Sequence, residues 1–188
     1  MRTSVVRKPV VAIGLAVVAV VAAAGLYWFQ PWKLWVDRTV REELPPAAAP
    51  VSPDAPETGA DGAPSAPAGP KVLASGSFIS HEHATKGAVR IVELADGSRT
   101  LRLEGLDTSN GPDLRVWLTD APVKEGVAGW RVFDDGAYVS LGKLKGNKGD
   151  QNYALPADVD LGRYSSVAIW CDRFDVSFGA AELSKAAA

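Results

Sequence analysis

The feature that most restricts the fold of this chain is an alternation of apolar and polar residues between residues 101 and 178. A period of two over four to eight residues is typical of β-strands with one buried face. Turn-forming sequences separate the alternating segments, such as ADGS at 95–98, SNGPD at 109–113, DDG at 134–136 and KGNKGD at 145–150. The apolar positions are Leu101 and Leu103; Leu114, Val116 and Leu118; Val167, Ile169 and Cys171; and Phe174, Val176 and Phe178. The pattern predicts an all-β domain over residues 71–188, an antiparallel β-sandwich of about seven or eight strands.

The N-terminal region follows a different pattern. Val10 to Phe29 contains no charged residue, and about 20 apolar residues suffice to cross the hydrocarbon core of a bilayer. Arg2, Arg7 and Lys8 precede this run, so the positive-inside rule places residues 1–9 in the cytoplasm. A cleaved secretory signal is the alternative, because AAAG at 22–25 offers small residues, but the apolar run is longer than a signal requires. We therefore expect a single-pass signal-anchor in the cell membrane over residues 10–29, with the rest of the chain extracytoplasmic.

Two segments connect the predicted anchor to the predicted domain. Residues 30–44 form a juxtamembrane segment, and we expect KLWVDRTVREEL at 33–44 to prolong the helix. Residues 45–70 contain eight of the 13 prolines and no Lys or Arg. Such a composition cannot bury enough apolar surface to fold. We expect a disordered Pro/Ala-rich linker that tethers the domain away from the membrane.

Charge and motif content exclude some functions. The formal net charge of −2 lacks the basic excess of a nucleic-acid-binding surface, so we expect no nucleic acid partner. The chain contains no Gly-x-Ser-x-Gly sequence, and no carboxylate pair or Ser/His/Asp set is singled out for hydrolysis. The sequence therefore does not indicate a hydrolytic enzyme.

Cys171 is the only cysteine of the chain. The strand alternation places it beside Val167 and Ile169 on the face expected to be buried, where a free cysteine packs as a small hydrophobe. An unpaired cysteine in an exported protein also raises the question of redox chemistry or of an intermolecular disulfide. Arg173 could lower the pKa of the thiol, whereas Asp172 and Asp175 act in the opposite direction. We expect a partly buried thiol at the end of its strand, with a route to solvent or to a cofactor.

The only histidines, His81 and His83, lie two residues apart in SHEHAT. On a strand this spacing places both side chains on one face, and with Cys171 they could supply nitrogen and sulfur ligands to copper, zinc or haem iron. The same spacing is common at solvated strand ends, and the chain has no Cys-x-x-Cys-His sequence for covalent haem attachment. We assign no metal site from the sequence and leave haem or copper as unassigned candidate cofactors.

Two further features carry weaker signals. Alternation turns Trp117 and Trp170 away from the predicted core. On that face they could bind a partner or pack beneath a loop, and we favour packing beneath a loop. KGNKGDQNY at 145–153 lacks the spacing of a phosphate-binding loop and is interpreted as a mobile hairpin.

Several pieces of the C-terminal region occur in an order that resembles a known family. They are NGPDL at 110–114, LKGNKGDQNY at 144–153 and VAIWC at 167–171, within a stretch from about residue 72 to residue 183. This stretch is similar to the electron-transfer DM-thirteen domain. The resemblance implies an extracytoplasmic β-sandwich with a redox role centred on the cysteine numbered 171 here.

Two functional classes follow from the sequence. The first is a membrane-anchored extracytoplasmic domain with a redox or electron-transfer role centred on Cys171, acting with a redox partner. The second is a non-catalytic binding or interaction module of the cell envelope. Cys171, His81 and His83 are the candidate site residues in the first class.

Overall fold

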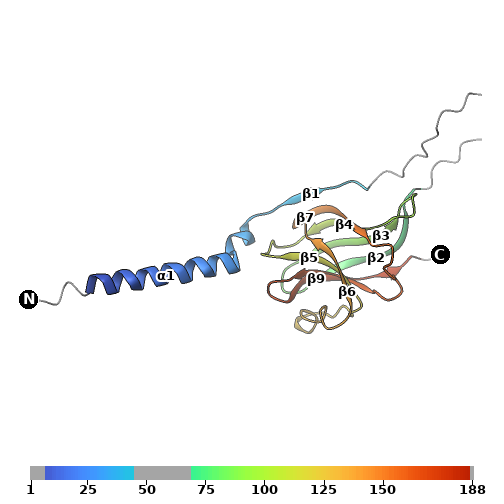
Figure 1. The fold of residues 1–188 in the computed structure, drawn as a ribbon. Coiled ribbons are helices and arrows are strands. Elements are labelled where there is room, and N and C mark those ends of the chain that lie inside the picture. The colour runs from blue at the N-terminus through green and yellow to red at the C-terminus, as the bar shows by residue number, and fades with distance from the viewer. Residues whose placement is uncertain (1–6, 45–68, 187–188) are drawn as a thin grey trace, which may run out of the picture.

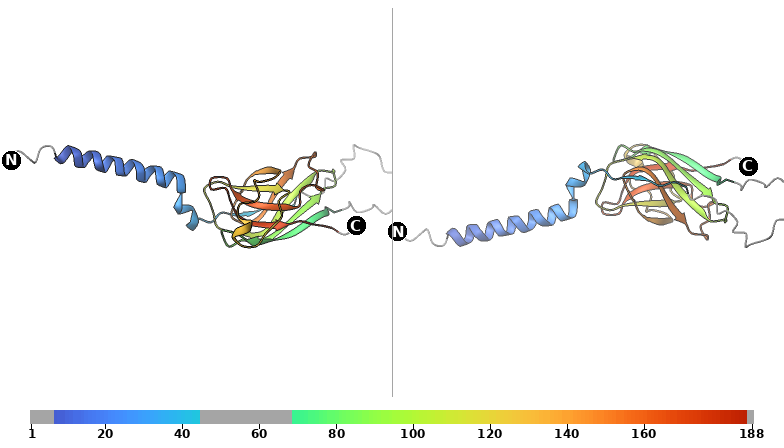
Figure 2. Two further views of the ribbon diagram at one scale, coloured as in Figure 1. Left: turned by 90° about the horizontal axis from the view of Figure 1, so that it is seen from below. Right: turned by 90° about the horizontal axis from the view of Figure 1, so that it is seen from above.

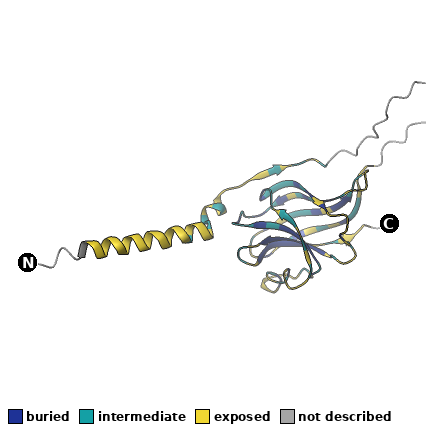
Figure 3. Cartoon of the chain, viewed as in Figure 1, coloured by how far each residue is buried: buried dark blue, intermediate teal, exposed yellow. Residues whose placement is uncertain are grey.

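The computed structural model describes residues 7–44 and 69–186, which form a long helix joined to a β-domain (Figure 1). Helix α1 spans Arg7–Phe29 and extends away from the strands, so it exposes apolar side chains on all sides (Figure 3). A helix that is apolar all round is stable only where its whole surface avoids water. The segment Pro9–Phe29 is long and apolar enough to cross a membrane, and its end at Phe29 agrees with the predicted anchor.

The helix does not continue into residues 33–44, so that prediction is wrong. Gln30 has a left-handed backbone with φ of 45°, and Pro31 begins a short 3-10 helix, η1, over Pro31–Trp35. Proline disfavours the α-conformation in the residue before it, which ends the helix at this point. The chain then becomes extended and forms strand β1, Thr39–Arg41.

The β-domain is one hydrogen-bonded sheet in the order β1-β7-β4-β3-β2-β9-β8-β5-β6, with the short β10 also beside β2. Figure 2 shows the domain and the helix from two further sides. The pairs are antiparallel except β1–β7, which is parallel. The remaining strands are β2 (Lys71–Ser80), β3 (Lys86–Glu93), β4 (Arg99–Asp107), β5 (Leu114–Thr119), β6 (Tyr138–Lys143), β7 (Lys148–Leu155), β8 (Ser166–Cys171), β9 (Val176–Glu182) and β10 (Ser184–Lys185).

Strand β2 joins the two halves of this sheet. Its residues 71–77 pair with β3, and its residues 78–80 pair with β9. The sheet curls, and side chains of both halves meet in one core, including Ile91 and Leu103 from one half and Val116 and Ile169 from the other. The predicted all-β class is therefore confirmed, as a continuous curled sheet with more strands than the alternation predicted.

A second apolar layer covers the outer face of β5, β8 and β9. Trp117 and Trp170 are buried there with Phe133, beneath the segment 121–137 that contains the short 3-10 helix η2, Val127–Gly129. The preference for loop packing over an exposed aromatic surface is thus confirmed for both tryptophans.

The juxtamembrane strand β1 is built into the edge of the domain. Thr39, Val40 and Arg41 pair in parallel with Lys148, Gly149 and Asp150 of β7. The domain is therefore attached to α1 directly through η1 and β1. The predicted 45–70 linker lies outside the described residues apart from its last two. Strand β1 precedes it and strand β2 follows it, so it connects two strands of the β-domain and does not connect α1 to the domain.

Glycines of the KGNKGD segment explain why β1 can approach so closely. A Cβ at Gly146 would overlap the carbonyl oxygen of Arg38, and a Cβ at Gly149 would overlap that of Val40. Asn147 between them is buried, accepts a hydrogen bond from the Arg38 N–H (2.7 Å) and donates one to the Thr108 carbonyl (2.8 Å). This segment binds β1 in a fixed arrangement, so its interpretation as a mobile hairpin is wrong.

Candidate functional site

Cys171 is the last residue of β8 and is completely buried in the core. Its position at the strand end agrees with the prediction, but the predicted partial exposure is wrong. Burial raises the pKa of the Cys171 thiol, because the charged thiolate is poorly solvated there, while hydrogen bonds from the backbone amides of Arg173, Phe174 and Asp113 lower it. The net effect is a raised pKa, so the thiol is protonated at neutral pH.

Two turns supply these amides. The turn after β8 returns at Phe174, whose N–H donates to the Cys171 carbonyl (3.2 Å), and the turn before β5 is joined to it by a hydrogen bond from the Asp172 N–H to the Asp113 carbonyl (3.0 Å). Arg115 forms ion pairs with both Asp113 (3.4 Å) and Asp172 (3.0 Å). Asp172, one of the two carboxylates that the sequence placed beside the cysteine, is therefore paired with an arginine.

The structure does not place the two histidines on one face. Strand β2 ends at Ser80, and residues 81–83 form a bend that separates their side chains. His81 is buried, bonds to Ser177 Oγ (2.8 Å) and the Lys124 carbonyl (3.1 Å), and stacks on Phe133. Burial lowers the pKa of His81, and this effect outweighs the hydrogen bond to the Lys124 carbonyl, which acts to raise the pKa. The ring is therefore neutral.

His83 lies over the ring of the core residue Phe178, with their centroids 4.0 Å apart. Burial lowers the pKa of His83, and the carboxylate of Glu82, 3.9 Å from its Nε2, opposes that shift. In residues 7–44 and 69–186 no three His, Cys, Asp or Glu side chains lie together as a metal-binding group. The geometry therefore does not assemble Cys171, His81 and His83 into a ligand set for copper or haem iron.

A mostly apolar cavity of about 280 Å³, the junction cavity, lies where the end of α1 meets the β-domain. Its walls come from the end of the helix and η1 on one side and from the β-domain on the other: Phe29, Pro31, Leu34, His83, Pro112, Phe174 and Phe178. Phe29 stacks on Phe174, with ring centroids 5.7 Å apart. Phe174 lies in the turn after Cys171, and Pro112 lies in the turn that is joined to it by the Asp172–Asp113 hydrogen bond, so the two turns next to Cys171 form part of the wall of this cavity.

Arg173 fastens the helix end to the domain beside the junction cavity. Its Nη1 donates to the Trp28 carbonyl (2.7 Å), and its guanidinium lies 5.3 Å from the centre of the Trp28 ring. The sequence suggested Arg173 as a partner of the thiol, whereas the structure turns its side chain toward α1. The effect of Arg173 on the pKa of the thiol comes from its backbone amide.

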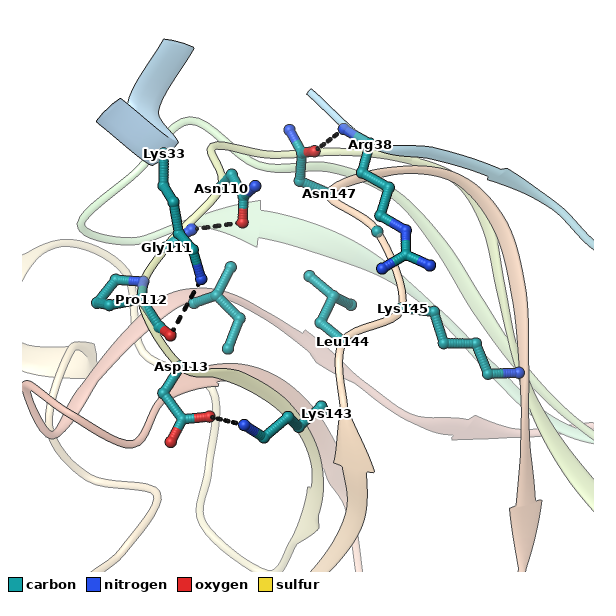
Figure 4. Close-up of a pocket in the computed structure, with 12 residues that line it drawn as sticks. Lys33, Arg38, Asn110, Gly111, Pro112, Asp113, Lys143, Leu144, Lys145 and Asn147 are labelled. Carbon is teal, nitrogen blue, oxygen red and sulfur yellow. Dashed lines mark hydrogen bonds and ion pairs between the residues drawn. The ribbon is translucent and has the colours of Figure 1, made fainter. Parts of the chain in front are cut away.

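A polar cavity of about 250 Å³ shares the loop 110–112 with the junction cavity. Figure 4 shows Lys33 reaching the Pro112 carbonyl (3.3 Å) and Lys143 pairing with Asp113 (3.5 Å). Arg38 also lines this space, which we call the basic cavity. The contributions of residues 29–38 to both cavities were missed from the sequence, because they depend on contacts with residues more than 70 positions away.

Comparisons with known proteins bear on this site. No curated protein and no solved structure matches the chain. The family described as Electron transfer DM13 matches residues 77–183, which include Cys171, both histidines and the turns around the sulfur. The match covers more than half of the chain and agrees with the resemblance of its motifs, and the chain belongs to the Electron transfer DM13 family.

Proposed function

We propose that this protein is a membrane-anchored, extracytoplasmic electron-transfer domain that works at the junction cavity with Cys171. One observation carries the proposal: Cys171 is buried at the end of β8, directly before the turn whose Phe174 forms part of the wall of an apolar cavity at the end of the apolar helix. Family membership supports a role related to electron transfer. Arg2, Arg7 and Lys8, which precede the uncharged run Val10–Phe29, support an N-terminus in the cytoplasm.

The surroundings of Cys171 limit the chemistry that it can perform. Thiol–disulfide exchange requires a thiolate that another sulfur can approach, and the Cys171 side chain is completely buried with a raised pKa. An intermolecular disulfide is disfavoured for the same reason. Cys171 is instead suited to a role that needs a polarisable, protonated sulfur without contact with a bulky partner, because burial outweighs the nearby N–H groups and keeps the thiol neutral.

The described residues do not fit a haem or copper cofactor coordinated by Cys171 and the histidines. The polar groups around the sulfur are backbone amides, which donate hydrogen bonds and do not ligate metals. His81 is occupied on both ring nitrogens, and His83 lies against Phe178. We therefore propose no step through such a group.

Substitution of Cys171 tests the proposal in the full chain reconstituted in lipid. We expect voltammetry to show a redox response of the wild-type protein that Cys171→Ser and Cys171→Ala both lose. Each variant should lower the free energy of unfolding by only about 1 kcal/mol, the usual effect of a single substitution. Val176→Ala is the matched control, because Val176 neighbours Cys171 in the core and carries no sulfur. A full redox response in a folded serine variant would reject the role of Cys171.

A second function, a non-catalytic binding module of the cell envelope, is favoured by the basic cavity. Lys33, Arg38 and Lys143 converge there beside the end of α1 (Figure 4). This binding function and the electron-transfer function predict different results. If the protein is a binding module, an anionic envelope ligand should bind the Cys171→Ser variant as well as wild type, and Lys143→Gln should weaken that binding.

A further inference from the structure

Three aromatic side chains on the outer face of the sheet form a continuous stack, the aromatic column. Tyr138 at the start of β6 lies on Trp117 of β5, with ring centroids 3.9 Å apart and planes 7° apart. Trp117 in turn lies on Trp170 of β8, with centroids 4.9 Å apart. Tyr138 is 45% exposed, whereas Trp117 and Trp170 are buried. The column therefore runs from the protein surface to the interior through directly contacting rings.

The two tryptophans are unusual in their hydrogen bonding. Buried indole N–H groups normally have an acceptor, but among the described residues the Nε1 atoms of Trp117 and Trp170 have none. An indole that loses one electron becomes acidic and gives up its N–H proton where an acceptor is in reach. Without an acceptor the oxidised ring keeps its proton, and the missing electron can be replaced by a neighbouring ring with no proton transfer.

The column ends beside the proposed site. The next ring, Phe133, meets Trp170 edge-on with centroids 6.4 Å apart, and a benzene ring is much harder to oxidise than an indole. Trp170 precedes Cys171 in β8, and their side chains occupy opposite faces of the sheet, one in the outer layer and the other in the core. The inner end of the column is thus one strand thickness from the sulfur.

We propose that Tyr138, Trp117 and Trp170 form a one-electron relay between the β6 surface and the Cys171 end of β8. The proposal rests on the electron-transfer function proposed above. An oxidised metal complex of high potential at the β6 surface removes one electron from Trp117, directly or through Tyr138. Trp170 then reduces Trp117, and a reduced metal complex docked at the Cys171 end of β8 returns one electron to Trp170. When Tyr138 takes part, it releases its phenolic proton to water on oxidation and regains one on reduction. The net change is one electron from donor to acceptor.

The test uses the full chain in detergent micelles with a ruthenium photo-oxidant attached through Ser140→Cys. Ser140 is exposed on β6 and is paired with Trp117, and the buried Cys171 leaves the new thiol as the labelling site. A flash in the presence of a sacrificial cobalt(III) quencher converts the label to ruthenium(III), which regains one electron from the protein. Transient absorption then follows the loss of ruthenium(III) and the rise and decay of tryptophan radicals.

We expect a protonated tryptophan radical cation in the otherwise wild-type protein. Trp117→Phe should abolish its signal and slow the loss of ruthenium(III), Trp170→Phe should shorten its lifetime, and Tyr138→Phe should leave a tryptophan radical. Trp130→Phe is the matched control, because Trp130 also has a buried, unpartnered indole nitrogen but lies outside the column. It should leave the signal unchanged.

Two results would overturn the relay. One is the absence of any tryptophan radical in the labelled Ser140→Cys protein without a further substitution. The other is an unchanged radical signal in a folded Trp117→Phe protein, with folding checked by its thermal midpoint. Cys171→Ser should retain the radical signal of the column, so a failure of the Cys171 proposal and a failure of the relay give different results.

Discussion

The edge and the centre of this sheet are held together by different kinds of contact. At the edge, β1 is fixed to β7 by charged and amide groups: Lys145 Nζ lies 2.8 Å from Glu42 Oε1, and Lys148 Nζ lies 2.7 Å from Asp37 Oδ2. At the centre, β5 and β8 meet through completely buried apolar residues such as Val116 and Ile169. The difference indicates that the centre supplies global stability, while the edge supplies a specific and separable attachment of the domain to its helix.

The largest effect is expected at the centre. Ile169→Ala removes three buried carbons from the core and should lower the free energy of unfolding by about 2–5 kcal/mol. Chemical denaturation followed by tryptophan fluorescence measures this change. Val127→Ala is the control, because Val127 is an apolar residue that is 73% exposed, and it should change stability little. Equal effects of the two substitutions would contradict the assignment of the core.

A steric substitution at the edge should have a smaller effect. In Gly146→Ala the new Cβ would overlap the Arg38 carbonyl, and this glycine does not need a positive φ, so the effect comes from β1 alone. We expect β1 to be displaced, with the free energy of unfolding lowered by about 1–3 kcal/mol. Hydrogen exchange should show lost protection of β1 amides while β5 and β8 stay protected.

The control for this substitution is Gly69→Ala, since a Cβ at Gly69 meets no atom within 4 Å. It should leave exchange in β1 unchanged. If Gly146→Ala exposed β8 amides as strongly as those of β1, the edge and the centre would be one cooperative unit and the comparison would fail.

The fold of the centre could be predicted from the sequence because its signal is local. Alternation identified the inward residues of β4, β5 and β8, such as Leu101, Val116 and Ile169, from neighbours two positions away. The edge could not be predicted in this way, because β1 has only three residues and pairs with a segment more than a hundred positions later. Gly146 and Gly149 were the available signal, but their function depends on a strand that the pattern did not reveal.

The candidate site likewise has one feature that could be predicted from local sequence and others that depend on contacts between distant residues. Cys171 was identified as the last inward position of an alternating segment, and the structure places it at the end of β8. Its complete burial depends on the turns at 110–113 and 172–175, and the junction cavity depends on Phe29 reaching Phe174. The shared face expected for His81 and His83 assumed a strand that in fact ends at Ser80.

Removing one charge at the edge should have a modest effect. Glu42 accepts hydrogen bonds from Lys145 Nζ and from the Asn152 N–H (2.7 Å). Both partners of this ion pair are partly exposed, so water screens it, and Glu42→Gln should lower the free energy of unfolding by about 1 kcal/mol. Glu43→Gln is the control at the adjacent position. Faster hydrogen exchange at the Asn152 amide in the first variant only would support the assignment.

The smallest effect is expected from the pH dependence of the edge. The pKa of Asp37 is lowered by hydrogen bonds from Lys148 and Asn147. Burial alone would raise the pKa of Glu42, but the hydrogen bonds from Lys145 and Asn152 lower it overall. A carboxyl group whose pKa is lower in the folded state stabilises that state above its unfolded pKa. The ordinary values here are 3.8 for Asp37 and 4.5 for Glu42. This contribution disappears as the pH falls through the folded-state pKa.

Acid should therefore release β1 before it unfolds the centre, with the change beginning below about pH 4.5. Hydrogen exchange of the Val40 amide as a function of pH, corrected for the intrinsic exchange rate, measures the release. Asp37→Asn removes one of the two titrating groups and should make the transition shallower, with a slight loss of protection at neutral pH. A release that began near pH 6.5 would instead point to protonation of His81 or His83, since burial lowers the pKa of both rings. That result would mean that the edge loosens as a consequence of changes around the histidines of the β-domain, and that the attachment of β1 is not separable from the rest of the sheet.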